Sequence, residues 1–287
     1  MLELLLQNLV NGILMGCVYA LVALGLALQF GVMDIINFAH GEFVMIAMYL
    51  VYWASLLLAI PGSATSLVVA PLFFVFGLVV YKLVIDRIVG TYPLAQIAAT
   101  IGLMVLLRNL ALAAWKAQPR GLQYEVLRGG IGLGPVVVPI SRLTAAGVSI
   151  ATMLALHWFL TKTRVGLALR ATSDDMHAAA LLGINVRKMF AVAFGLGCAI
   201  IGIAAAFIMT FQQVNPEAGL TWGLISWIIV VMAGLGGVSG VLFSGLILGI
   251  VEALEITFWD PRASLAVMYS LFILILWVRP RGLFGRR

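Results

Sequence analysis

The first long apolar run of the chain, residues 4–28, reads LLLQNLVNGILMGCVYALVALGLAL and contains no charged residue. A helix needs about 20 apolar residues to cross the hydrocarbon core of a bilayer, so this run is long enough to span one. It does not alternate with a period of two, as a strand of a membrane barrel would. The run therefore predicts a membrane-spanning helix.

Eight further apolar runs follow, and they set the fold class. They cover residues 43–60, 64–81, 94–115, 143–161, 189–211, 220–233, 238–251 and 264–278. The runs at 220–233 and 238–251 are short and are separated by a glycine-rich turn, which suggests broken or partly re-entrant helices. We expect an all-α polytopic membrane protein, a bundle of about nine (eight to ten) transmembrane helices that satisfy their own backbone hydrogen bonds.

The composition supports a membrane location for the whole chain. Of the 287 residues, 63% are hydrophobic and 10% are charged, whereas soluble chains are about 25% charged. The net charge of +6 does not indicate a nucleic-acid partner, because basic residues of membrane proteins gather in cytoplasmic loops. We expect a single transmembrane domain over residues 1–287, with the lipid bilayer as its solvent.

Lysine and arginine are distributed unevenly between the two predicted sides of the membrane. One side receives Lys82, Arg87, Lys162, Arg164, Arg170, Arg187, Lys188, Arg279, Arg281, Arg286 and Arg287. The other receives Lys116, Arg120, Arg128, Arg142 and Arg262. The side with more basic residues is predicted to be cytoplasmic, which places the C-terminus inside and, with nine spans, the N-terminus outside.

No motif predicts catalysis, a metal site or a cofactor. The chain lacks the G-x-x-x-x-G-K-[ST] sequence of a phosphate-binding loop, and GLGGVSG at residues 234–240 has no lysine, so it predicts a tight turn between helices. Two cysteines within apolar runs and three scattered histidines form no ligand set. If transport uses ATP, another chain must bind it.

A polar stretch, GVMDIINFAHGE at residues 31–42, separates the first two runs. It contains Asp34, Asn37, His40 and Glu42 between segments that are almost free of polar groups. Charged groups are costly inside a bilayer, so this stretch is either a solvated loop or a packed, partly re-entrant segment beside a water-filled path. The interleaved apolar residues favour the second interpretation and make the four polar residues candidates for a translocation path.

The glycine turn is a second candidate part of that path. The N-terminus of a broken helix suits the carboxylate of an amino acid. The turn that contains Gly236 and Gly237 is as good a place for such a contact as the polar stretch.

A long polar excursion at residues 162–188 contains a predicted short helix, residues 173–184. Ser173 is expected to cap its N-terminus, two aspartates suit the positive end of its dipole, and Gly183 can take the left-handed position after its last turn. A helix this short needs a partner. Either it contacts another protein, or it lies on the lipid surface as an amphipathic helix. The candidate contact residues are Asp174, Asp175, His177, Ala178, Ala179, Leu181, Leu182 and Gly183.

Several motifs, in this order, resemble the permease subunits of branched-chain amino acid ABC importers of the LivH type. They are NFAHGE at residues 37–42, TRVG at 163–166, RA at 170–171, AAALLGINV at 178–186, AGLGGVSG at 233–240 and RPRGLFG at 279–285. The similarity extends along most of the chain. One departure is His177, where the general importer coupling motif often has glutamate before an Ala-Ala pair.

This resemblance implies a multi-pass subunit of a bacterial cytoplasmic membrane that is not itself an enzyme. Its implied partners are a second, homologous permease, two ABC ATPase subunits that contact residues 162–188, and an extracytoplasmic substrate-binding protein. The implied substrate is a branched-chain or other hydrophobic amino acid; related permeases carry urea or short amides.

A stand-alone secondary transporter of a small polar solute is the alternative. It would need an ion site built from Asp34, Glu42, Arg108, Glu252 or Glu255, most of which fall near predicted run ends. A membrane enzyme has no supporting group of residues.

Overall fold

The computed structural model describes residues 1–123, 126–234, 237–259, 264–279 and 282–284, and almost all of its regular structure is helical. The elements in chain order are α1 (Leu2–Met33), α2 (His40–Leu58), α3 (Ser66–Val80), α4 (Asp86–Ile88), α5 (Pro93–Trp115), β1 (Gly130–Leu133), β2 (Val136–Pro139), α6 (Ile140–Lys162), α7 (Arg164–Asp174), α8 (Met176–Leu181), α9 (Val186–Ile208), α10 (Ala218–Ala233), α11 (Val238–Phe258) and α12 (Ser264–Val278). A 3₁₀ turn, Ser63–Thr65, precedes α3, and a π-helical turn, Tyr81–Ile85, joins α3 to α4.

Each of the nine predicted runs contains a helix, and the all-α polytopic fold is confirmed. Among the described residues, seven helical segments are long and apolar enough to cross a membrane, and α10 and α12 are shorter apolar helices. The expectation of a short helix at 238–251 is wrong, because α11 continues to Phe258. It does so through Glu252 and Glu255, which therefore lie within a spanning helix rather than beyond its end.

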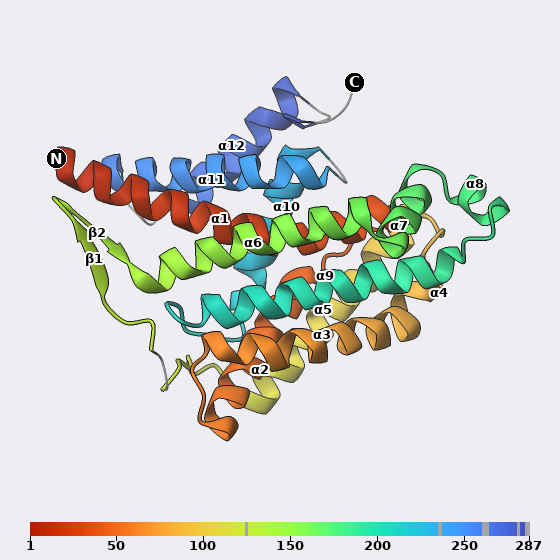
Figure 1. Ribbon diagram of the computed structural model, residues 1–287, viewed down its shortest axis with the longest axis horizontal. Helices are drawn as coiled ribbons and strands as arrows, with labels where there is room; N and C mark the ends of the chain where they lie inside the picture. The colour runs from red at the N-terminus through yellow and green to blue at the C-terminus, as the bar shows by residue number, and fades with distance from the viewer. Residues whose placement is uncertain (124–125, 235–236, 260–263, 280–281, 285–287) are drawn as a thin grey trace.

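The first helix, α1, lies at the centre of the bundle (Figure 1). It packs against α6, α9, α10 and α11, and its side chains from Cys17 to Gln29 are all buried. Two glycines of α1, Gly12 and Gly16, face Gly249 and Gly245 of α11: a Cβ atom at Gly16 would lie 2.7 Å from the carbonyl oxygen of Gly245. The two backbones approach closely only because these residues lack side chains.

The peripheral helices expose their apolar surface. Only 11% of the apolar window of α5 is buried within this chain, compared with 78% of that of α1. Between these extremes, α3 packs along α9, where Gly77 meets Cys198 and Gly202 meets Ala70. The bundle is therefore built around α1, α9 and α10, with α5 on its outside.

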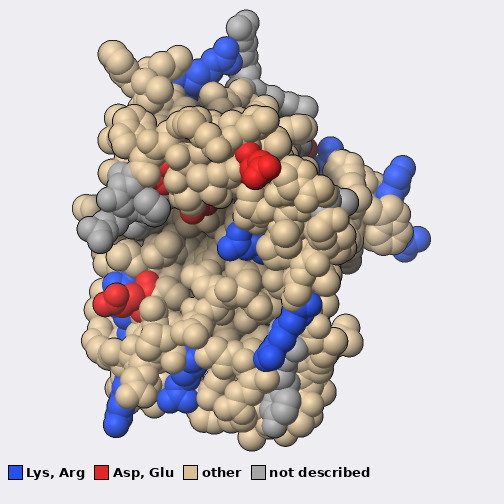
Figure 2. All heavy atoms as spheres, turned by 90° about the vertical axis from the view of Figure 1, so that its left-hand side faces the viewer, with Lys and Arg blue, Asp and Glu red and all other residues tan. Residues whose placement is uncertain are grey.

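The two ends of the bundle differ. At the hairpin end, defined by the start of α1 and by β1 and β2, the side-chain amide of Gln7 bonds to both the N–H and the carbonyl of Val137 at 2.8 Å (Figure 1). The α8 end carries α7 and α8. Figure 2 views the hairpin end, which is hollowed near its middle and has acidic and basic side chains around the hollow.

The antiparallel hairpin of β1 and β2 was not predicted. Its sequence signal is Gly134-Pro135 between β-branched residues, which is typical of a turn between two strands.

Candidate functional site

The chain between α1 and α2 folds back along α1. α1 ends at Met33, and Asp34 takes a left-handed conformation with φ of 50°. The ring nitrogen Nε2 of His40, the first residue of α2, lies 3.1 Å from the carbonyl oxygen of Val22. At 1.5 Å per residue, Val22 lies about 16 Å before the end of α1. Residues 34–39 are therefore a packed re-entrant segment and not a solvated loop, and α2 begins inside the bundle.

The irregular backbone of this segment is bonded by its own Asn37 side chain, which α1 holds in place, and by a side chain of α5. The amide of Asn37 donates to Gln29 Oε1 on α1 at 3.0 Å, and its own oxygen accepts from the N–H of Ala39 at 3.1 Å. From α5, the hydroxyl of Thr100 donates to the carbonyl of Ile36 at 3.0 Å. Non-helical backbone is tolerated at membrane depth only where the protein supplies such partners.

An ion pair joins the start of α2 to α5. Arg108 donates to Glu42 Oε1 through Nη2 at 2.5 Å and through Nε at 3.0 Å. The side chain of Glu42 is 1% exposed and that of Arg108 is 29% exposed. Glu42 Oε2 is buried without a hydrogen-bond partner among the described residues. Sequence reasoning named both residues but could not predict that they pair, because they lie on different helices.

Glycines let the first turn of α10 meet the first turn of α2. A Cβ atom at Gly41 would lie 2.6 Å from the Cα of Gly223, and one at Gly219 would lie 2.9 Å from Glu42 Oε1. Two helices thus begin side by side within the bundle, with Glu42 between them.

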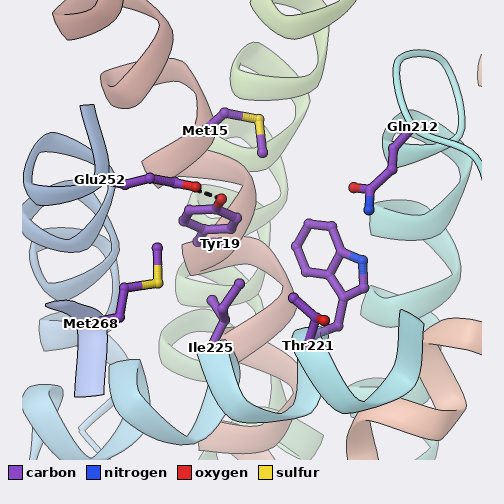
Figure 3. Close-up of a pocket in the computed structure, with 8 residues that line it drawn as sticks. Met15, Tyr19, Gln212, Thr221, Ile225, Glu252 and Met268 are labelled. Atoms are coloured by element: carbon purple, nitrogen blue, oxygen red, sulfur yellow. Dashed lines mark hydrogen bonds between the residues drawn. The ribbon is translucent and has the colours of Figure 1, made fainter. Parts of the chain in front are cut away.

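A cavity of about 330 Å³ lies between α1, α10, α11, α12 and the segment after α9. Its lining consists of Met15, Tyr19, Gln212, Thr221, Trp222, Ile225, Glu252 and Met268. Met15 and Tyr19 lie near the middle of α1, and Glu252 lies in the half of α11 nearer the hairpin end. Figure 3 shows Glu252 and Tyr19 on one side of the space and Gln212 on the other, with Thr221 and Ile225 on α10.

The polar groups of the cavity are oriented by specific contacts. The hydroxyl of Tyr19 donates to Glu252 Oε2 at 2.7 Å. The rings of Tyr19 and Trp222 pack edge to face, with centroids 5.8 Å apart. The cavity therefore combines an oriented acid and polar N–H groups with thioether and alkyl walls.

Sequence reasoning missed this cavity. It considered Glu252 only as a candidate ion ligand near the end of an apolar run. An acidic residue within an apolar run was the available signal, since such residues mark functional pathways in membrane proteins. The other lining residues carry no local signal.

The α8 segment is capped at both ends. Its N-cap is Asp175, whose Oδ1 accepts from the N–H groups of His177 at 2.8 Å and Ala178 at 3.0 Å. These two hydrogen bonds, that from Ala178 first, lower the pKa of the Asp175 carboxyl from its ordinary value. At the other end, Gly183 has φ of 83°, as predicted.

That C-terminal cap is a complete Schellman motif. The N–H of Ile184 donates to the carbonyl of Ala179 at 3.1 Å, and the N–H of Gly183 donates to that of Ala180 at 3.0 Å. The motif ends α8 after Leu181, so the helix has six residues.

The prediction that Ser173 caps this helix is wrong. Ser173 and Asp174 belong to the last turn of α7, and the hydroxyl of Ser173 donates to the carbonyl of Gly31 near the end of α1. Asp175 caps α8 instead, because its backbone is extended, with φ of −156° and ψ of 107°. This conformation places its carboxylate over the first turn of α8.

The two leucines of the α8 segment point away from the bundle. Leu181 is 90% exposed and Leu182 is 80% exposed, whereas Ala179 is buried at 2%. Ala178 is also exposed. The segment therefore rests on the protein through Ala179 and presents an apolar pair outward.

Some predicted path residues are not brought together. Asp34 is exposed at the end of α1 and takes no part in the contacts of Glu42. Gly236 lies outside the described residues, and Gly237 lies beyond the C-terminal end of α10, whereas Glu42 meets its start. Among the described residues, no group of His, Cys, Asp and Glu could hold a metal ion.

A bundle of spanning helices around a cavity with both polar and apolar walls is the architecture of a membrane transport protein. A family model described as "Branched-chain amino acid transport system / permease component" matches residues 8–276. The chain belongs to this family.

Individual relatives agree with this assignment over nearly the whole chain. The high-affinity branched-chain amino acid transport system permease protein BraD of Pseudomonas aeruginosa is 31% identical over 297 residues, which cover 98% of this chain and 96% of BraD. LivH of Escherichia coli K12, a protein of the same description, is 31% identical over 300 residues, with the same coverage. A probable LivH of Methanocaldococcus jannaschii is 27% identical over 285 residues, covering 92% and 88%. No solved structure matches this chain significantly.

Proposed function

We propose that this permease imports branched-chain or other hydrophobic amino acids through a bacterial cytoplasmic membrane, driven by ATP hydrolysis in separate subunits. The observation that carries the proposal is the match of the family model to residues 8–276. The thioether and alkyl walls of the cavity suit a small ligand with an apolar side chain.

The proposed partners are a second, homologous permease subunit, two ABC ATPase subunits and an extracytoplasmic binding protein. The α8 segment supports the contact with an ATPase. It is a short helix, too short to stand alone, yet it is capped at both ends and exposes Leu181 and Leu182. A rigid apolar knob of this kind fits a groove on a partner protein.

The proposed orientation places α8 and the C-terminus in the cytoplasm. Lys162, Arg164, Arg170, Arg187 and Lys188 lie on α6, α7 and α9 around the α8 segment. Basic residues accumulate on the cytoplasmic side. Single cysteines near Lys82, near Arg164 and after Arg281 should react only with a reagent that reaches the cytoplasm. Labelling of any of them from outside would contradict the orientation.

Uptake by reconstituted vesicles tests the function. The permease, co-expressed with the other components of its transport system, should co-purify with ATPase subunits. Leucine uptake should require both ATP inside the vesicle and the binding protein outside it. Uptake that is driven by an ion gradient without ATP would instead identify a stand-alone secondary transporter, for which Glu42, Arg108, Glu252 and Glu255 are the candidate charges within spanning helices.

A further inference from the structure

We propose that the cavity within this single chain recognises the charged backbone of an amino acid, with the ammonium group on Glu252 and the carboxylate on the N–H groups of Gln212 and Trp222. The inference rests on the proposed function for the kind of substrate. It adds where within the permease that substrate is held, and by which side chains.

The acidic side of the cavity is built for a cation. Glu252 lies within the apolar helix α11 and lines the cavity. Tyr19 donates to one of its carboxylate oxygens at 2.7 Å, which orients the carboxylate and leaves the other oxygen to accept from a ligand. An ionisable group within a spanning helix is costly and marks substrate or ion pathways.

The opposite side offers one buried N–H donor without an acceptor, on Trp222, and the side-chain amide of Gln212. Trp222 is 2% exposed and lines the cavity, and its indole Nε1 has no hydrogen-bond partner among the described residues. Buried indole N–H groups usually have an acceptor. Figure 3 shows the Gln212 amide directed toward the same space. A ligand carboxylate in the cavity would supply the missing acceptor.

The electrostatic surroundings match a ligand with both charges. Glu255 and Arg142 both lie within electrostatic reach of Glu252. Arg142 also lies over the ring of Phe211, 5.8 Å from its centroid. The charged groups at and near Glu252 are thus of both signs, as expected for a site that binds a ligand with both charges.

The volume and the apolar walls of the cavity determine which side chain the ligand can have. A volume of about 330 Å³ is at the lower limit of the roughly 300–1,000 Å³ typical of small-molecule pockets. Met15, Ile225 and Met268 supply apolar surface for an alkyl side chain. The cavity is therefore sized for one small amino acid.

Photo-crosslinking tests the assignment. The probe is photo-leucine, a leucine analogue with a diazirine in its side chain, applied to the permease–ATPase complex without the binding protein. We expect labelled peptides that contain Met15, Ile225 or Met268. Excess leucine should abolish the labelling. Equal concentrations of 4-methylpentanoate, which lacks the ammonium group, or 3-methylbutylamine, which lacks the carboxylate, should not.

Two variants assign the recognition to Glu252. Glu252→Gln should reduce the labelling roughly tenfold or more, the scale of losing a charge-assisted hydrogen bond, and Glu252→Asp should restore part of it. Glu3→Gln, at an exposed position of α1, is the matched control and should label as the wild type does. If the Glu252 variants do not accumulate, competition by 4-methylpentanoate and 3-methylbutylamine against labelling of the wild-type protein still tests whether both charges are recognised.

Labelling outside the cavity, or competition by either single-charge analogue as effective as that by leucine, would overturn the inference. A failure of the proposed function would look different. If the proposed function is wrong, wild-type vesicles will show no ATP-dependent leucine uptake, whatever the cross-linking pattern.

Discussion

Two breaks in the apolar pattern differ in which side chains they bury: residues 34–42, which end in the first turn of α2, and residues 175–184, which contain α8. The first places Asn37, His40 and Glu42 inside the bundle, each 1% exposed or less. The second holds Leu181 and Leu182 outside it, each at least 80% exposed. Polar groups are buried in one break and apolar groups are exposed in the other.

The comparison separates an internal role from an interaction role. The buried polar groups find partners within this chain: Asn37 on Gln29, His40 on Val22 and Glu42 on Arg108. The exposed leucines gain nothing from this chain, and in the proposed function they contact an ATPase subunit. Changes in the first break should therefore destabilise the subunit, and changes in the second should separate it from its partners.

The largest effect is expected when one member of the buried ion pair is removed. Glu42→Leu leaves the guanidinium of Arg108 without its partner within the bundle, and breaking a buried pair costs about 3–5 kcal/mol of folding free energy. Thermal unfolding of the purified protein should shift markedly downward, and leucine uptake should be lost.

A double variant sharpens this prediction. Glu42→Leu combined with Arg108→Leu removes both charges and should recover much of the stability. Asn109→Leu is the control, because Asn109 is exposed on the same helix and its side-chain amide donates to the carbonyl of Val105 on that helix. If Glu42→Leu unfolds at the wild-type temperature, the pair is not a structural link.

A change in α8 should have little effect on the stability of the subunit but a large effect on its association with ATPases. Leu182→Glu places a charge in an apolar contact, and an unpaired charge is costly to bury. The variant should fold with wild-type stability, because Leu182 is 80% exposed in this chain. Its co-purification with ATPases should fall roughly tenfold or more, together with uptake.

Lys116→Gln, at an exposed position just after α5 and outside residues 162–188, should assemble and transport normally. Wild-type ATPase association and uptake by Leu182→Glu would show that α8 is not the coupling contact.

The smallest effect is expected at the cap of α8. Asp175→Ala removes the acceptor for the N–H groups of His177 and Ala178 and should weaken ATPase association a few-fold by fraying the helix. Asp175→Asn keeps a good cap and should remain close to the wild type. An alanine variant that matches the wild type would mean that the partner, and not the cap, orders α8.

The pKa of Asp175 determines the pH range in which this cap stabilises α8. Because hydrogen bonds lower that pKa in the folded state, the cap stabilises α8 at neutral pH, and its contribution is lost only as the pH falls through the lowered value. Association of the wild-type complex, measured during acidification, should therefore retain the cap contribution down to the ordinary range of aspartate.

Local patterns predicted more of the fold than of the site. The apolar runs predicted about nine helices, but not that Gly12 and Gly16 of α1 face Gly245 and Gly249 of α11. The interleaved polar residues at 34–42 favoured the packed segment that the structure has. The cap of α8 was assigned to Ser173, because the sequence does not indicate that α7 extends to Asp174.

The sequence by itself determined the class of protein, the spans and the two breaks, because an apolar helix satisfies its own backbone locally and its length is read directly. Only the tertiary structure decided which polar groups meet. Tyr19 and Glu252 are 233 residues apart, and Glu42 and Arg108 are 66 apart. Such pairs depend on how helices pack around α1, and no pattern within a single helix encodes that packing.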